Sequence, residues 1–237
     1  MLYERIKPRM LGSLMVAMLE KTKQTLGLQL SYIEFTSVAI SIAGNSSKSL
    51  FCVIFHDKSD GEDIGMLLSN QILNEFEQVY AEELKSNTPV NMKGFQDFYF
   101  RLNSIIRGTG RPVLDELRKN RAVVLAFLVK ENLRDGDSSI ISYASGDIDH
   151  FGVLANLKPL ISAATDLMGI ANDSSESIWL ESSPTRASRI LVHKIVPGTH
   201  LVVQFSIRFD NALYEPAVNR TIRLLKKVCI LGEMMKL

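Results

Sequence analysis

The sequence of 237 residues has few of the features that mark several protein classes. It contains two cysteines, Cys52 and Cys229, which fits a reducing compartment in which no disulfide framework is needed. Seven prolines and 14 glycines are too few for a disordered or collagen-like chain. The 27 basic side chains nearly balance the 26 acidic ones, and this net charge of +1 argues against a protein whose whole surface binds nucleic acid, while it allows a local basic patch.

Long hydrophobic runs are also missing, and a membrane-spanning helix needs about 20 consecutive apolar residues. The longest apolar stretches, residues 122–129 and 201–205, have the length of strands. The charged residues 1–10 contain no apolar signal core. We therefore expect a cytoplasmic protein that touches membranes at most peripherally.

The sequence lacks the residue patterns of common catalytic and metal sites. It has no H-E-x-x-H, C-x-x-C or G-x-S-x-G motif. Residues 56–63 are densely polar, but an EF-hand register lacks the required carboxylates, so we interpret them as a strand-to-helix loop with acidic caps. Residues 108–111 begin like a phosphate loop without the G-K-[ST] that completes it, and we interpret them as a linker. We predict no enzyme, no metal site and no cofactor.

Two other candidate groups have simpler structural explanations. Cys52 lies in an apolar strand, which predicts a buried and unreactive thiol. Arg189 and His193 share one strand and could meet an anionic partner. We favour a solvated strand face for them and keep the anionic partner as an alternative.

Apolar periodicity divides the chain into two modules, residues 1–110 and 111–237. In the first module the patterns predict a helix over 9–26, strands over 28–35, 38–42 and 50–55, and helices over 62–85 and 95–106. Residues 50–55 are almost wholly apolar, which predicts a central strand buried on both faces. The element order is α-βββ-α-α.

The second module has the order ββ-α-βββ-α. Its predicted elements are strands over 122–129 and 140–144, a helix over 152–169, strands over 178–180, 190–195 and 201–207, and a helix over 213–234. This order predicts a five-stranded antiparallel sheet with helices packed on it. The first module repeats it without the two opening strands, so we predict an α+β fold of two small modules.

These patterns resemble those of known families. The first module resembles a longin domain, in which an amphipathic helix precedes three strands and a long helix ending in F-x-x-x-Y-x-x-x-L, matched here by Phe76, Tyr80 and Leu84. The second resembles a roadblock or longin module of profilin-like type, with residues 142–147 as its second strand and turn. A longin domain normally opens with two strands, which residues 1–7 cannot supply.

The resemblance implies a non-enzymatic protein-interaction module, an adaptor or regulator of small GTPases and membrane traffic. Its expected partners are a second copy, another longin or roadblock protein, or a small GTPase. We expect a stable dimer or complex because a three-stranded sheet leaves an unpaired edge. The alternatives are a small-molecule sensor of related fold and an enzyme whose site is assembled across the two modules.

The last helix supplies the candidate interaction residues. Arg220, Arg223, Lys226 and Lys227 make one edge of the helix basic, and Ile230 and Met234 add apolar surface near its end. We predict contact with an acidic partner surface or with anionic lipid. A solvated face and burial within the chain are the alternatives.

Overall fold

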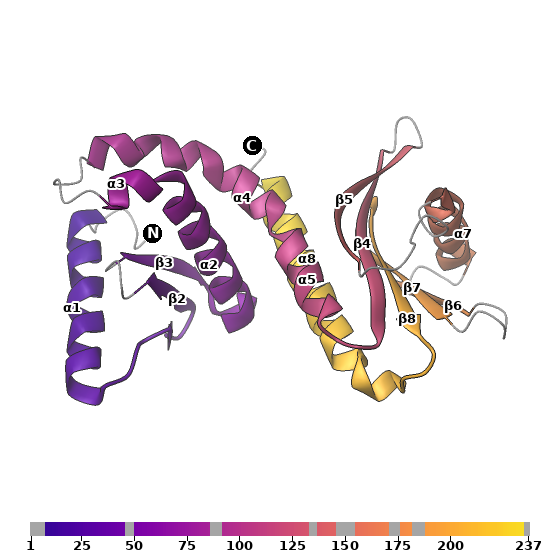
Figure 1. The fold of residues 1–237 in the computed structure, drawn as a ribbon, viewed down its shortest axis with the longest axis horizontal. Coiled ribbons are helices and arrows are strands. Elements are labelled where there is room, and N and C mark those ends of the chain that lie inside the picture. The colour runs from indigo at the N-terminus through magenta and orange to yellow at the C-terminus, as the bar shows by residue number, and fades with distance from the viewer. Residues whose placement is uncertain are drawn as a thin grey trace. The chain divides into compact units, whose positions relative to one another are not determined.

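A computed structural model describes residues 8–45, 50–85, 92–132, 137–145, 155–170, 176–181 and 188–234. The chain divides into two compact units, Met1–Val90 and Asn91–Leu237. Each unit contains one antiparallel sheet packed by helices (Figure 1), which confirms the predicted α+β class. No helix of the described part is long and apolar enough to span a membrane.

The first unit is built around a three-stranded sheet of order β1-β2-β3. Its elements are α1 (Pro8–Leu26), β1 (Tyr32–Glu34), β2 (Val38–Asn45), β3 (Leu50–Asp57), the short 3-10 helix η1 (Lys58–Asp60), α2 (Glu62–Val79) and α3 (Ala81–Lys85). We predict that residues 1–7 cannot supply the two opening strands of a longin domain. These residues lie outside the described part of the chain.

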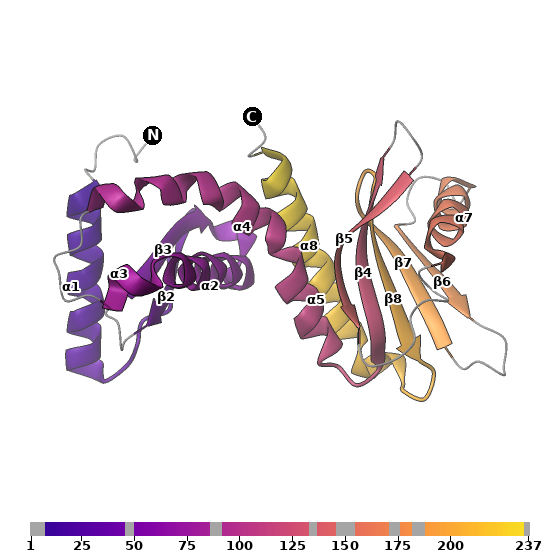
Figure 2. The same cartoon turned by 45° about the horizontal axis from the view of Figure 1, so that its top comes forward.

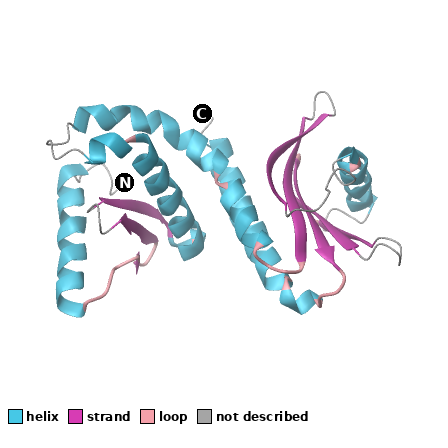
Figure 3. Ribbon diagram, in the orientation of Figure 1, coloured by secondary structure: helices cyan, strands magenta, loops and turns pink. Residues whose placement is uncertain are grey.

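The prediction that residues 50–55 form a central strand is wrong. They belong to β3, which pairs with β2 and stands at the edge of the sheet among the described strands. Helices face both sides of this sheet, α1 on one and α2 on the other (Figure 3). The strand is therefore apolar along its length because both of its faces are covered, although one backbone edge has no strand beside it.

The two helices cover the sheet to different degrees. On α2, a Cβ added to Gly65 would lie 2.0 Å from the Ser41 hydroxyl oxygen and 2.3 Å from Nε2 of His56, so only glycine allows this close approach. On the opposite face, α1 reaches the sheet through the buried side chains of Met15 and Leu19. The tight layer of this unit is the one between α2 and the sheet.

The long helix predicted over residues 62–85 is interrupted at Tyr80. The backbone there has φ −110° and ψ 30°, which ends α2 and separates it from α3. Tyr80 is buried, with its ring centroid 4.8 Å from that of Phe76, while Phe76 and Leu84 are half-buried. The three residues of the longin-like pattern thus differ in burial.

The second unit contains a five-stranded sheet of order β5-β4-β8-β7-β6, antiparallel throughout. Its elements are η2 (Met92–Arg101), α4 (Leu102–Gly108), α5 (Gly110–Arg118), β4 (Val123–Asn132), β5 (Asp137–Ser145), α7 (Leu157–Ile170), β6 (Ser177–Glu181), β7 (Ser188–Val196), β8 (Thr199–Ser206), η3 (Asn211–Leu213) and α8 (Glu215–Met234). The predicted five-stranded antiparallel sheet is confirmed, and from β4 to α8 the described elements follow the predicted order along the chain. Residues 142–145 of the predicted second strand and turn lie in β5, and 146–147 lie outside the described residues.

Helices cover both faces of this larger sheet. On one face α7 packs through Ile161 against Phe127, Val192 and Val202, all of them 1% exposed or less. On the other face α5 and α8 lie side by side against the sheet (Figures 1 and 2). The three inner strands, β4, β8 and β7, consequently have a strand on each side and helices over both faces, and most of their apolar side chains are buried.

The prediction of a linker at residues 108–111 is also wrong. The buried Thr109 joins α4 to α5, and its hydroxyl donates a hydrogen bond to the Ile105 carbonyl at 2.8 Å. Pro112 lies in the first turn of α5, where its missing N–H leaves no helical hydrogen bond unmade. Because α4 packs against α8, the compact units divide at Val90/Asn91, earlier than the predicted boundary at 110/111.

Candidate functional site

The free edge of β3 is the first candidate. The Lys58 N–H donates to the Ser37 carbonyl at 3.1 Å, and this register directs the backbone groups of residues 52, 54 and 56 toward β2. The N–H and C=O groups of Phe51, Val53 and Phe55 therefore point away from β2. In the part of the chain that the structure describes, no strand pairs with the outward groups of Phe51 and Val53. An apolar edge of this kind is a template for another strand.

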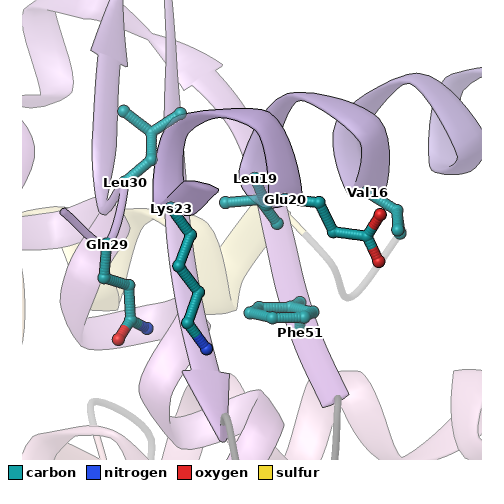
Figure 4. Close-up of a pocket in the computed structure, with 7 residues that line it drawn as sticks. All are labelled: Val16, Leu19, Glu20, Lys23, Gln29, Leu30 and Phe51. Atoms are coloured by element: carbon teal, nitrogen blue, oxygen red, sulfur yellow. The ribbon is translucent and has the colours of Figure 1, made fainter. Parts of the chain in front are cut away.

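The helix above this edge leaves space beneath it. A cavity of about 190 Å³ between α1 and the sheet is lined by Leu19, Lys23, Leu30 and Phe51 among others (Figure 4). A second cavity of about 260 Å³ lies along Leu11, Met15, Phe51, Val53 and Phe55. The side chains of the β3 edge are therefore only partly packed by α1.

The outer side of α1 is apolar as well. Met10, Leu14 and Met18 recur every fourth residue and are 66%, 57% and 36% exposed. They lie beside the stripe of Met15 and Leu19 that faces the sheet, so α1 has more apolar surface than its own unit buries.

The basic edge of α8 contains the residues singled out from the sequence. Arg220 and Arg223 are exposed, and Lys226 and Lys227 are half-buried. The structure supplies a counter-charge that the sequence of the helix did not reveal: the Lys226 ammonium contacts Oε2 of Glu176 at 2.6 Å, from 50 residues away. This hydrogen bond lowers the pKa of the Glu176 carboxyl. Ile230 and Met234, 49% and 64% exposed, continue the surface toward the end of α8.

The predicted solvated face of β7 is wrong for His193. Its ring is buried between β7 and α8, with Nδ1 2.6 Å from the Ser177 hydroxyl oxygen and Nε2 4.0 Å from Oε2 of Glu176. Burial lowers the pKa of His193 to about 4, so the ring is neutral at pH 7. The strand lies between β6 and β8 under a helix, and no solvated face remains at this position.

Arg189, on the same strand, makes contacts that hold neighbouring elements of the fold together. Its Nε donates to Oε1 of Glu181 at 2.9 Å, and its Nη1 donates to the Tyr214 hydroxyl at 3.2 Å and to the side-chain oxygen of Asn211. The guanidinium carbon also lies 5.9 Å from the Trp179 ring centroid. These contacts connect β6 and β7 to the segment before α8. They also give the charged guanidinium of Arg189 partners within the chain.

The polar cluster over residues 56–63 joins β3 to α2, and Asp57 caps the short helix η1, but no side chain caps α2, whose N-cap is Gly61. The Asp57 carboxylate accepts a hydrogen bond from the Ser59 N–H at 2.7 Å, and Nε2 of His56 lies 2.9 Å from the Ser41 hydroxyl oxygen. Within the described ranges, no three His, Cys, Asp or Glu side chains are grouped as metal ligands. Burial raises the pKa of Cys52 to about 11, which keeps it a thiol at pH 7.

Comparisons with known proteins give structural neighbours only. No family model and no curated protein matches the sequence. Myxococcus xanthus MglB has 20% identity and a TM-score of 0.43, covering 52% of this chain and 89% of its own. A Roadblock/LC7 domain from Streptomyces avermitilis has 17% identity and a TM-score of 0.38, covering 50% and 95%. Myxococcus xanthus MglC has 13% identity and a TM-score of 0.38, covering 49% and 95%.

These neighbours include the roadblock type of domain that the sequence patterns resemble. Each matches about half of this chain. At these identities and TM-scores, nothing about the activity or the partners of this chain follows from the similarity.

Proposed function

We propose that the chain is a non-enzymatic protein-interaction module, an adaptor or regulator of small GTPases and membrane traffic that acts by roadblock- or longin-type pairing. One observation carries this proposal: the apolar strand β3 has a backbone edge with no strand beside it in the described part of the chain. Strands of this kind add a strand from another chain, because main-chain hydrogen bonds then satisfy the open edge.

The partner that this edge fits best is a second copy of the chain. The residues Phe51-Cys52-Val53-Ile54-Phe55 are nearly symmetric about Val53. An antiparallel pairing of two β3 strands centred on Val53 places Phe51 of each copy opposite Phe55 of the other. The outward-pointing N–H and C=O groups of Val53 then bond to those of the other copy across the two-fold axis.

A pair of strands alone buries less surface than a stable interface, which needs about 1,200–2,000 Å². The exposed stripe of Met10, Leu14 and Met18 on α1 offers further apolar surface in the same unit. We therefore expect α1 to take part in the contact together with the β3 edge.

Sedimentation of the full chain tests the pairing. We expect a dimer at micromolar concentration, and a monomer after Val53→Pro, because the Val53 N–H points to the open edge and proline there breaks no bond to β2. Val53→Ala is the packing control and stays dimeric. Ile54→Pro is the folding control, since it removes an N–H that bonds to β2. A monomeric wild-type chain contradicts the proposal, and so does a folded Val53→Pro variant that remains dimeric.

The GTPase part of the proposal needs its own experiment. Affinity purification of the full chain from native lysate, in a locked GTP analogue or in GDP, should recover a GTPase preferentially in one nucleotide state. Equal recovery in both states, or none, contradicts a regulatory role and leaves the dimer result untouched.

A cavity in the second unit favours the second candidate function, a small-molecule sensor. Its residues are distinct from the β3 edge, so binding a ligand and pairing with a partner are compatible.

A further inference from the structure

A cavity of about 210 Å³ lies in the second unit between the sheet and the helices α4, α5 and α8. Its apolar walls are the side chains of Leu128 on β4, Ile141 on β5, Val196 on β7 and Val228 on α8. All of its lining residues belong to this unit, and none belongs to the β3 edge.

The cavity results from bulges in two pairs of strands and from short side chains on α8. The register of β4 and β5 shifts beside Val129, leaving Ile141 unpaired, and that of β7 and β8 shifts beside Val196, leaving Ile195 unpaired. The helix above contributes Cys229 and Gly232, and a Cβ on Gly232 would meet nothing closer than 3.7 Å. Bulged strands opposite small residues keep this space open where close packing is the rule.

Charged groups also line the cavity. Arg107 on α4 and Lys130 on β4 contribute two cations, and Glu233 on α8 contributes one carboxylate. The Lys130 ammonium lies 3.3 Å from Oε1 of Glu233, and both side chains are about half exposed, so this pair is weak. No ion pair joins Arg107 to any residue that the structure describes. The cavity is thus apolar inside, with an excess of positive charge around it.

We propose that this cavity binds a small alkyl carboxylate, with the alkyl chain among the apolar side chains and the carboxylate between Arg107 and Lys130. An apolar cavity of roughly 150 Å³ holds a benzene molecule, and this one has space for about seven water-sized groups. The alkyl chain of octanoate has about that number of carbon groups. Arginine binds carboxylates through two parallel hydrogen bonds, which favours a carboxylate over an uncharged head group.

Cys229 provides a reporter inside the cavity. Burial raises the pKa of its thiol, which slows alkylation, and because its side chain lines the cavity a ligand bound there should slow alkylation further. In the full-length Cys52→Ala variant it is the remaining cysteine. We expect octanoate to slow alkylation of Cys229 in a saturable manner, with half-protection near or below about 1 mM. Octanol, the uncharged analogue, should protect about tenfold more weakly.

Two variants locate the ligand. Arg107→Gln should weaken protection by octanoate about tenfold and leave octanol unchanged, because it removes only the charge. Gly232→Leu should fill the cavity and abolish protection by both. If Gly232→Leu fails to fold, Ile141→Phe fills the same space from the exposed strand β5. Circular dichroism of each variant confirms that it is folded before alkylation is measured.

Several results would overturn the proposal. These are the absence of saturable protection, equal protection by octanol and octanoate, and undiminished protection in a folded cavity-filling variant. Protection by phosphatidylglycerol vesicles but not by octanoate would assign the surface to a lipid bilayer instead. The Val53→Pro variant should bind octanoate as the wild-type chain does, so a failure here is distinct from a failure of pairing.

Discussion

The two sheets of this chain contain similar apolar strands in different surroundings. In the second unit, Leu201, Val202 and Val203 on β8 are fully buried because strands flank β8 on both sides and helices cover both faces. In the first unit β3 is equally apolar, yet its residues are only half-buried and one edge has no strand beside it among those described. An apolar run therefore reports that the two faces of a strand are covered. It does not report whether the strand has neighbours.

The same contrast holds for the helices. In the second unit α7 packs its buried side chains directly onto the sheet, whereas in the first unit two cavities separate α1 from β3. The smaller sheet thus has a tight face under α2 and a loose face under α1. The first unit is thus the more loosely packed of the two on this face, and four predictions test the contrast between the units.

The largest expected effect compares one phenylalanine from each sheet. Phe127 on β4 is 1% exposed within the second core, so Phe127→Ala should lower the free energy of unfolding by about 3–5 kcal/mol. Phe51 on β3 already borders both cavities beneath α1, so Phe51→Ala should cost less than half of that, about 1–2 kcal/mol. Urea unfolding of both variants measures the difference. Equal losses would show that the first unit is packed as tightly as the second.

Local sequence predicted the second unit better than the first for an identifiable reason. Residues 190–195 were predicted as a strand and β7 spans Ser188–Val196, since alternating apolar residues end at a turn containing Gly198 with φ 69°. The edge position of β3 depends on which strands lie beside it, and nothing within residues 50–55 encodes that. Likewise, the Lys226 counter-charge and the burial of His193 arise from contacts between distant segments.

Acid should destabilise the second unit through His193. Its folded pKa of about 4 lies below the ordinary value of 6.5, so the unfolded chain binds more protons between these values. Stability is therefore complete above pH 6.5 and falls by up to about 3 kcal/mol as the pH approaches 4. Burial also lowers the pKa of His200, which adds in the same direction.

Urea unfolding at pH 7, 6 and 5 measures this loss in wild type and in His193→Asn. The variant removes the titrating ring, so its stability should fall less steeply between pH 7 and 5. Identical slopes in the two proteins would exclude His193 as the source of the acid sensitivity.

A pair of glycines tests the tight and loose faces of the first unit directly. Gly65→Ala puts a methyl group against Ser41 and His56 and should cost about 2 kcal/mol, since α2 must move away from the sheet. Gly12 on α1 has nothing within 4 Å of an added Cβ, so Gly12→Ala should stabilise by about 0.5–1 kcal/mol. Thermal unfolding should shift in opposite directions for the two variants. A shift in the same direction would contradict the assignment of a tight and a loose face.

The smallest expected effect concerns the basic edge of α8 in the second unit, whose contacts should differ in salt dependence from those of the apolar β3 edge in the first unit. We propose that Arg220, Arg223, Lys226 and Lys227, with Ile230 and Met234, contact an acidic partner surface or anionic lipid. Each cation near an anionic bilayer contributes about 1 kcal/mol, and the field reaches about 8 Å at physiological salt. This contact should therefore weaken as salt is added, whereas pairing through β3 should persist.

Reversing two charges, Arg223→Glu with Lys227→Glu, should reduce sedimentation with phosphatidylserine vesicles at low salt and leave the melting temperature and the dimer unchanged. Lys226→Gln is the matched comparison, because its ammonium already binds Glu176 and its loss should affect stability more than vesicle binding. If the double reversal changes neither vesicle binding nor partner recovery at low salt, the basic edge only solubilises α8. Interaction would then rest on the apolar edge of the first unit, since nothing in the pairing of β3 depends on these charges.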